Sequence, residues 1–169
     1  MNIVLVCINN FQEYILDNIK QLIRLNHENI YILTNKVFFH KFEEFTAKIN
    51  LINIDELNEN FNYYSKTHLD KNMRNGFWAL TSLRFFYIYE FMKVYNIKDV
   101  IHLENDVLIY YNCSNIINNF EKEYLYIPFD TFKRNIASIM YIPSYELLKT
   151  ILDNYDYIII LSQSFIWLN

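Results

Sequence analysis

The segment at residues 98–112, KDVIHLENDVLIYYN, interrupts an apolar run with three polar residues. Val100–Leu103 predicts a buried strand, and a second apolar run follows at residues 107–109. Carboxylates seldom interrupt such a run, because burying an unpaired charge costs several kcal/mol. Glu104 and Asp106 lie two residues apart, so in an extended chain they point to the same face. We therefore expect both acids at the carboxyl end of a strand, in the crevice where open α/β sheets bind ligands.

Two hard oxygen ligands in that crevice suit Mg²⁺ or Mn²⁺ bridging to a substrate diphosphate. Asp106 is the better candidate for a direct metal ligand, whereas the longer Glu104 could act through water or hold a ribose hydroxyl. Asn105 is expected to point the opposite way, either to a substrate hydroxyl or into the turn. The alternative for both acids is a plain strand end turning into solvent.

The rest of the chain predicts a single α/β domain built on a parallel sheet with right-handed crossovers. Apolar runs predict strands at residues 2–8, 30–33, 51–54, 124–128, 136–142 and 157–161. Helical periodicity predicts helices at residues 11–25, 37–47, 76–95, 112–120 and 144–153, and residues 55–75 are expected to form a loop with a short helix. No glycine-rich phosphate loop follows the first strand, which argues against dinucleotide-binding and P-loop folds.

Bulk properties exclude several classes of protein. A chain of 169 residues that is 53% hydrophobic suggests one folded domain, and a net charge of -4 argues against nucleic-acid binding. An acidic protein that binds an anionic nucleotide needs a metal or an arginine nearby. No signal peptide or membrane span is expected. Cys7 and Cys113 lack metal-ligand spacing and are typical of a reducing compartment, so we expect a cytoplasmic protein.

Arg84 lies among apolar residues of the long predicted helix, where a buried guanidinium must be paired. Its planar fork suits a phosphate or the acids of residues 104–106. A structural ion pair with some other carboxylate is the alternative. His102, inside the predicted strand, is interpreted as a core histidine whose hydrogen bonds are satisfied, and a role in binding a ligand is the alternative.

Other polar residues follow predicted strands and belong at the edges of the sheet. Their amides could read a nucleobase, and ordinary turn residues are the alternative: Asn9, Asn10, Thr34 and Asn35. Asp130 follows another predicted strand and is a candidate catalytic base, with a plain loop acid as the alternative.

Phe77-Trp78, Arg84-Phe85-Phe86 and the run IHLENDVLIYYN together resemble GT-A-type glycosyltransferases. Their signature is an Asp-x-Asp motif after an apolar strand, preceded by a helix that often carries an arginine. The resemblance implies a Rossmann-like fold, with a mostly parallel central sheet and helices on both faces. It also implies a nucleotide-sugar donor and Mn²⁺ or Mg²⁺.

By position in that family, Glu104 and Asp106 stand for the two acids and Arg84 for the helix arginine. Cys7, Ile8 and Asn9 stand where the nucleotide base packs. Two features depart from the pattern: the first acid is Glu, and the chain is short. We expect a donor-binding half over about residues 1–110 and a partial acceptor half over about residues 111–169.

The expected function is metal-dependent transfer of a sugar from a nucleotide-diphosphate-sugar to an unknown glycan, protein or lipid acceptor. The alternatives are a non-catalytic nucleotide- or sugar-binding module, a truncated remnant of such an enzyme, a partner-binding protein and a nucleotidyltransferase. An incomplete acceptor half would expose apolar surface, which predicts self-association into a homo-oligomer. The bias toward Asn, Ile, Tyr and Lys is typical of an AT-rich genome, such as that of a large DNA virus, and would place the protein in the host cytoplasm.

Overall fold

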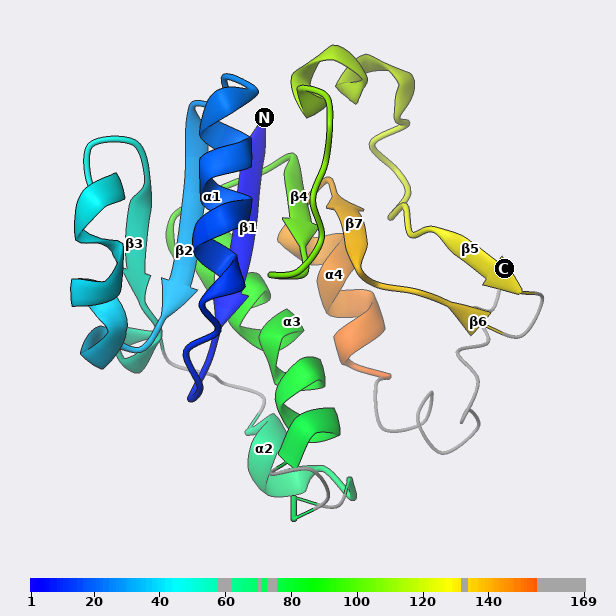
Figure 1. Cartoon of the computed structure of the whole chain (residues 1–169). Helices are drawn as coiled ribbons and strands as arrows, with labels where there is room; N and C mark the ends of the chain where they lie inside the picture. Colours follow the sequence, from blue (N-terminus) through cyan, green and yellow to red (C-terminus); the bar gives the residue numbers. More distant parts are fainter. Residues whose placement is uncertain (58–61, 70, 73–75, 132–133, 155–169) are drawn as a thin grey trace.

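The computed structural model describes residues 1–57, 62–69, 71–72, 76–131 and 134–154 (Figure 1). At its centre lies a five-stranded sheet with the order β3-β2-β1-β4-β7. Four strands are parallel: β1 (Asn2–Cys7), β2 (Asn29–Thr34), β3 (Asn50–Asn53) and β4 (Val100–Leu103). The edge strand β7 (Ile139–Ile142) pairs antiparallel with β4. The expected α/β fold with a mostly parallel sheet is confirmed.

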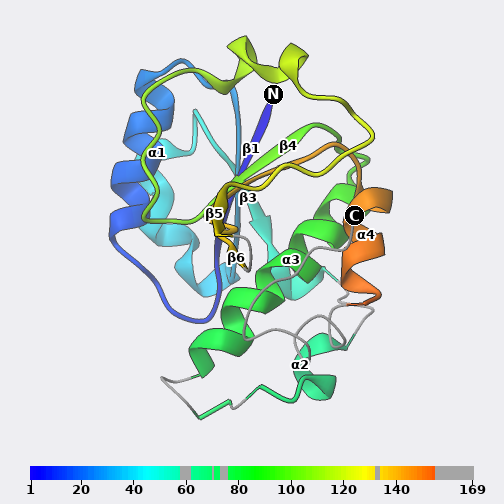
Figure 2. The same ribbon diagram turned by 90° about the vertical axis from the view of Figure 1, so that its right-hand side faces the viewer.

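Helices cover both faces of this sheet (Figure 2). One face carries α1 (Tyr14–Arg24) and the 3-10 helix η1 (Lys36–Phe45), and the other carries α3 (Phe77–Val94) and α4 (Tyr145–Leu152). Side chains of β1 alternate between the two cores: Ile3 and Leu5 pack with α1, and Val4 packs with α3. Burial on both faces is why β1 reads as a continuous apolar run.

The strand order brings distant segments to one edge of the sheet. β1 pairs with β2 on one side and with β4 on the other, with Cys7 opposite Thr34 and Ile3 opposite Ile101. The chain thus reverses its direction of winding between β1 and β4. Such switch points are where open α/β sheets leave a crevice at the carboxyl ends of their strands. The turn after β4 opens into this crevice.

The long helix and the last helix form as expected. The single glycine of the chain, Gly76, precedes α3 with φ 77°, a left-handed conformation that glycine adopts without a Cβ clash. Ser144 caps α4 by accepting a hydrogen bond from the Leu147 amide, at 3.4 Å. In the described part of the chain, the loop at residues 55–75 contains η2 (Ile54–Glu56) and α2 (Tyr63–Lys66).

Several predicted elements are present but differ in helix type or in length. The helix expected at residues 112–120 is two 3-10 turns, η4 (Cys113–Asn115) and η5 (Ile117–Asn119), and the first begins where the Asn112 side chain accepts from the Ser114 amide. The helix expected at residues 37–47 is the 3-10 helix η1, and the strand expected at residues 136–142 is limited to β7.

The strand expected at residues 124–128 is only an isolated bridge between Tyr126 and Tyr141. Pro128 follows, and a proline cannot donate a ladder hydrogen bond. The next residues form a separate hairpin of β5 (Phe129–Thr131) and β6 (Arg134–Asn135). The strand predicted at residues 157–161 lies outside the described residues. No helix within the described ranges combines the length and the apolar character needed to cross a membrane.

Candidate functional site

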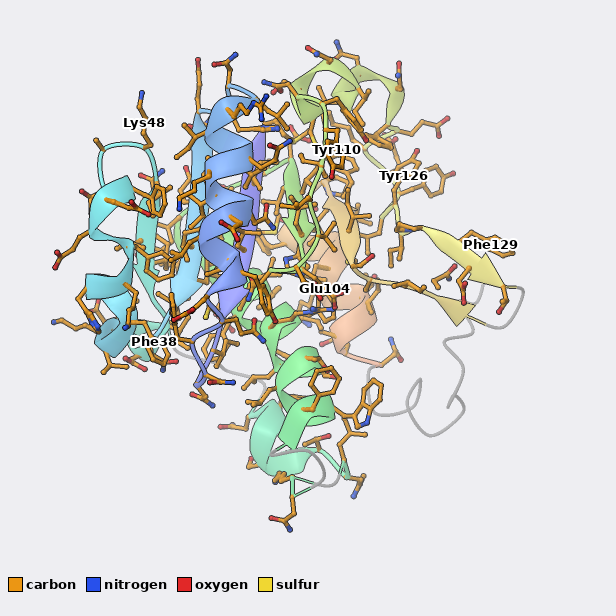
Figure 3. The ribbon with its side chains drawn as sticks, in the orientation of Figure 1. Phe38, Lys48, Glu104, Tyr110, Tyr126 and Phe129 are labelled. Carbon is orange, nitrogen blue, oxygen red and sulfur yellow. The ribbon has the colours of Figure 1, made fainter. Side chains whose placement is uncertain are left out.

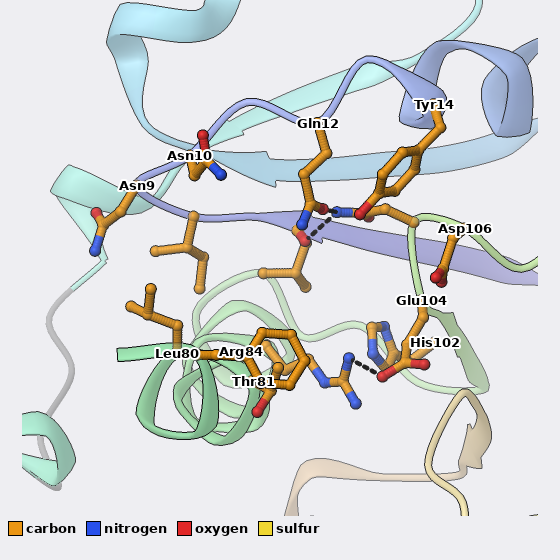
Figure 4. A pocket seen from close by; sticks show the side chains of 14 residues that line it. Asn9, Asn10, Gln12, Tyr14, Leu80, Thr81, Arg84, His102, Glu104 and Asp106 are labelled. Carbon is orange, nitrogen blue, oxygen red and sulfur yellow. Dashed lines mark hydrogen bonds and ion pairs between the residues drawn. The ribbon is translucent and has the colours of Figure 1, made fainter. Parts of the chain in front are cut away.

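A cavity of about 540 Å³ lies at the carboxyl edge of the sheet, between the end of β1, the turn after β4 and α3 (Figure 4). Its walls come from three segments that are distant in sequence. They are Val6, Ile8, Asn9, Asn10, Gln12, Tyr14, Phe77, Leu80, Thr81, Arg84, His102, Glu104, Asn105 and Asp106. Most of the site residues predicted from sequence therefore share one cavity.

Backbone hydrogen bonds hold the turn that carries the two acids. The Glu104 amide donates to the Ser138 carbonyl at 2.8 Å, and the Val107 amide donates back to the Glu104 carbonyl at 3.0 Å. Asn105 points to the opposite side, as expected from its position. Its Nδ2 donates to the Val6 carbonyl at 2.8 Å and to Oε1 of Gln12 at 2.7 Å. Asn105 thereby fixes the turn to β1.

A buried asparagine on α1 supports the same turn. Nδ2 of Asn18 lies within hydrogen-bond distance of the carbonyls of Glu104 (3.2 Å), Asn105 (3.3 Å) and Val107 (2.9 Å). Sequence reasoning missed this residue. The sequence did contain an indication, because Asn18 lies three residues after Ile15 and therefore on the apolar face of α1, where it is fully buried. A polar residue at such a position must find partners.

Arg84 and Glu104 form an ion pair across the cavity wall, with Nη1 2.6 Å from Oε1. Their side chains are 13% and 31% exposed, so the pair is mostly shielded from water. Arg84 also donates to the Ala137 carbonyl at 3.3 Å, and its guanidinium lies 4.8 Å from the Phe85 ring centroid. Arg84 is thus both a structural ion-pair partner and a contact of the acidic turn. It also neutralises the charge of Glu104.

Asp106 is the exposed acid of the turn, and Figure 4 shows it at the cavity beside Tyr14. It accepts no hydrogen bond and forms no ion pair with any residue that the structure describes. Burial, followed by the negative charge of Asp106, raises the pKa of Tyr14, so its phenol stays protonated. Because Arg84 offsets Glu104, the cavity keeps the negative charge of Asp106. An anionic ligand would need a cation here.

The residues fit a divalent cation that shares its ligands with a substrate. An unpaired carboxylate facing a cavity is a suitable oxygen ligand for Mg²⁺ or Mn²⁺, which keep several positions for water and phosphate oxygens. Within the described ranges, no group of three His, Cys, Asp or Glu side chains is close enough to hold a metal by itself. Asp106 would hold such a cation, and Glu104 is already paired with Arg84.

His102 differs from its expected role as a fully satisfied core residue. Its Nδ1 lies 3.0 Å from the Val4 carbonyl, but its Nε2 has no hydrogen-bond partner among the described residues. Burial, reinforced by the positive charge of Arg84, lowers the pKa of His102 to about 3. The ring is therefore neutral, and only one of its two nitrogens has a hydrogen-bond partner among the described residues.

The remaining predicted residues divide between the cavity and its support. Ile8 and Asn9 line the cavity. Cys7 and Thr34 are buried beneath it, where the Thr34 hydroxyl donates to the Cys7 carbonyl at 2.7 Å. Asn35 accepts from the Asn9 amide at 2.8 Å and thereby holds the loop after β1, where Asn9 has φ 60°.

Asp130, the candidate base, is not among the residues that line this cavity. It lies in β5 of the separate hairpin. Figure 3 shows the neighbouring Phe129 at the right-hand edge of the molecule and Glu104 near its middle. The role of Asp130 stays a prediction.

No protein-family model and no curated protein matches the chain. Solved structures do. One is the crystal structure of the glycosyltransferase GlyE of Streptococcus pneumoniae TIGR4, with a TM-score of 0.58 and 17% sequence identity. The match covers 96% of this chain and 38% of the GlyE chain. The apo form of GlyE gives a TM-score of 0.58 and 13% sequence identity, and the match covers 99% of this chain and 44% of the GlyE chain. The PaToxG glycosyltransferase gives a TM-score of 0.56 and 15% sequence identity, and the match covers 92% of this chain and 60% of the PaToxG chain.

This chain has the GT-A glycosyltransferase fold. At these identities the likeness establishes the fold alone. The chain spans 38% to 60% of the length of the chains it matches.

Proposed function

We propose that this chain is a metal-dependent glycosyltransferase domain that transfers a sugar from a nucleotide-diphosphate-sugar to a glycan, protein or lipid acceptor. One observation carries the proposal: an unpaired acid, Asp106, faces a cavity of about 540 Å³ at the switch point of a GT-A fold. That volume lies within the usual range for small-molecule sites, about 300–1,000 Å³.

Each side of the cavity has a role in this proposal. Asp106 is the direct ligand of Mn²⁺ or Mg²⁺, and the bound ion would neutralise the diphosphate and stabilise it as a leaving group. Arg84 holds Glu104 in place beside it. Ile8 and Asn9 line the cavity and take the nucleoside, and Figure 4 shows Asn9 at the side opposite Asp106. The donor therefore lies across the ends of β1 and β4.

Thermal melting against nucleoside diphosphates and their glucose conjugates, with and without Mn²⁺, tests the donor site. Binding to the native state adds about 2.7 kcal/mol to the free energy of unfolding at a ligand concentration of 100 Kd. The melting temperature rises as a result. We expect a shift for one nucleotide family that requires Mn²⁺ and disappears in Asp106→Asn. Asp17→Asn, which removes an exposed acid outside the cavity lining, should keep the shift. A metal-dependent shift that survives Asp106→Asn contradicts the assignment.

Hydrolysis of the donor separates an enzyme from a binding module. A transferase with a bound donor releases its sugar to water slowly when no acceptor is present. We expect Mn²⁺-dependent release of free sugar by the wild-type chain and none by Asp106→Asn. Metal-dependent binding without any hydrolysis would instead support the non-catalytic module.

A further inference from the structure

Buried polar atoms without partners gather at the cavity. Within the described part of the chain, six buried side-chain nitrogen and oxygen atoms have no hydrogen-bond partner. Three of them belong to cavity-lining residues: Nε of Arg84, Nε2 of His102 and Oδ1 of Asn105. Because native proteins rarely leave such atoms unpaired, several unpaired atoms on residues that line one cavity indicate a ligand with matching groups.

The hydrogen-bonding role of His102 follows from its neighbours. Its Nδ1 faces the carbonyl of Val4, which can only accept, so Nδ1 carries the proton. The ring is 1% exposed and has no carboxylate partner among the described residues, so a second proton would be a buried and unpaired charge. Nε2 therefore presents a lone pair and acts as an acceptor.

The unpaired atoms of His102 and Arg84 have complementary roles that define the ligand group, whereas Asn105 points away toward β1. His102 Nε2 accepts a hydrogen bond, and Arg84 Nε–H donates one. A phosphate oxygen accepts only, so it cannot satisfy His102. A hydroxyl both donates and accepts, so it matches this mixture. The wall beside His102 is therefore suited to a polyhydroxylated group.

The position of His102 indicates which hydroxyl of the donor it meets. His102 and Glu104 are two residues apart and point to the same face, and Figure 4 shows His102 next to Glu104 and away from Asn9. If the diphosphate binds at Asp106 and the nucleoside at Asn9, the group near His102 is the transferred sugar. This step rests on the proposed function.

We propose that His102 is a sugar-selecting residue, whose Nε2 accepts a hydrogen bond from a hydroxyl of the transferred sugar. Nε2 is itself buried, so the hydroxyl reaches it only after a local side-chain movement. Arg84 would have to give up its ion pair with Glu104, its hydrogen bond of 3.3 Å and its contact with the Phe85 ring, and the sugar hydroxyls would replace them. Its displaced guanidinium then offers its Nε–H to the same sugar.

Two substitutions separate selection from structure. His102→Asn keeps an N–H donor near the Val4 carbonyl and removes the acceptor at the Nε2 position, whereas His102→Phe keeps a ring and removes both. His27→Asn is the matched control, because His27 is a buried histidine outside the cavity lining. Dissociation constants are measured by calorimetry with Mn²⁺. The probes are the nucleoside diphosphate that raises the melting temperature most, its glucose conjugate and the monodeoxyglucose conjugates.

We expect wild-type protein to bind one monodeoxy conjugate about 10-fold more weakly than the parent conjugate, because the unpaired acceptor is left buried. In His102→Asn the parent conjugate should weaken by the same factor, the discrimination should vanish, and affinity for the free nucleoside diphosphate should hold. The control should discriminate like wild type.

Other outcomes overturn the proposal in distinguishable ways. In one such outcome, His102→Asn still distinguishes the parent conjugate from its monodeoxy analogue, and in another it loses affinity equally for the free diphosphate and the conjugate. Either result means that His102 has a structural role and that its Nε2 binds no sugar hydroxyl. Where His102→Asn does not fold, His102→Phe decides on the same comparison. If wild-type protein binds no nucleotide, the proposed function itself fails, and this inference fails with it.

Discussion

At the scale of single residues, one ion pair decides which acid of the turn is available to a ligand. Glu104 and Asp106 are equivalent in the sequence pattern, since both follow β4 on the same face. Arg84 pairs with Glu104 alone, at 2.6 Å, and Asp106 stays exposed. The choice comes from the position of α3, which places the guanidinium beside the first acid.

The energy of this pair can be measured by a double-mutant cycle of Arg84→Met and Glu104→Gln. We expect a coupling of about 2 kcal/mol in urea unfolding, because a charged hydrogen bond shielded from water contributes more than an exposed pair. The exposed pair of Lys149 and Asp153, also at 2.6 Å, is the control and should show a much smaller coupling. Equal coupling energies for the two pairs would show that shielding from water has no effect here.

At the scale of elements, the acidic turn depends on a helix that contributes no acid to it. Asn18 of α1 reaches three carbonyls of the turn, and Asn105 ties the turn back to β1. The turn is thus fixed from two sides before any ligand binds. Such pre-organisation reduces the entropy lost when a ligand is bound.

Asn18→Ala should therefore weaken both stability and binding. We expect a loss of about 2 kcal/mol in the free energy of unfolding, because buried carbonyls lose their donor. Mn²⁺-dependent nucleotide affinity should also fall several-fold, since the turn that carries Asp106 loosens. Gln21→Ala is the control: Gln21 donates once, to the Ile109 carbonyl at 2.9 Å, outside the turn. A control that loses affinity as much as Asn18→Ala would contradict this explanation.

At the scale of the whole molecule, burial of ionisable groups makes stability depend on pH. Burial lowers the pKa of His27, which the Tyr111 backbone partly opposes, and burial with Arg84 lowers that of His102 to about 3. In the unfolded chain both rings titrate near pH 6.5. The unfolded state then binds more protons, so stability is complete above that pH and falls as pH decreases.

We expect the free energy of unfolding to fall by about 2 kcal/mol for His102 between about pH 7.5 and pH 5, with a further loss from His27. Burial by itself would raise the pKa of Asp99, but hydrogen bonds from Lys122 and Tyr141 outweigh it and keep the pKa below its ordinary value of 3.8. Asp99 therefore adds a further loss of stability as the pH falls below that value. Urea unfolding across this range measures the slope, and His27→Asn should reduce it. A flat profile between these pH values would contradict the burial argument.

How much the sequence predicted depends on how local each feature is. Continuous apolar runs identified β1, β2 and β4, and helical spacing identified α1 and α3, because both patterns are set within a short stretch of chain. The fold class then followed from the order of strands and helices. Where a local pattern was ambiguous, tertiary packing decided the detail. The helix predicted at η1 formed as a 3-10 helix, and the strand predicted before Pro128 was wrong, since that segment makes only an isolated bridge.

The sequence by itself determined that two acids end a buried strand, and that an arginine precedes them on a helix. Only the tertiary structure decided that Arg84 pairs with Glu104 and leaves Asp106 exposed, that Asn18 supports their turn, and that His102 keeps an unpaired nitrogen. Those contacts join residues up to 98 apart, such as His102 and Val4. Spacing along the chain carries no information about such pairs, because strand register and helix placement set them.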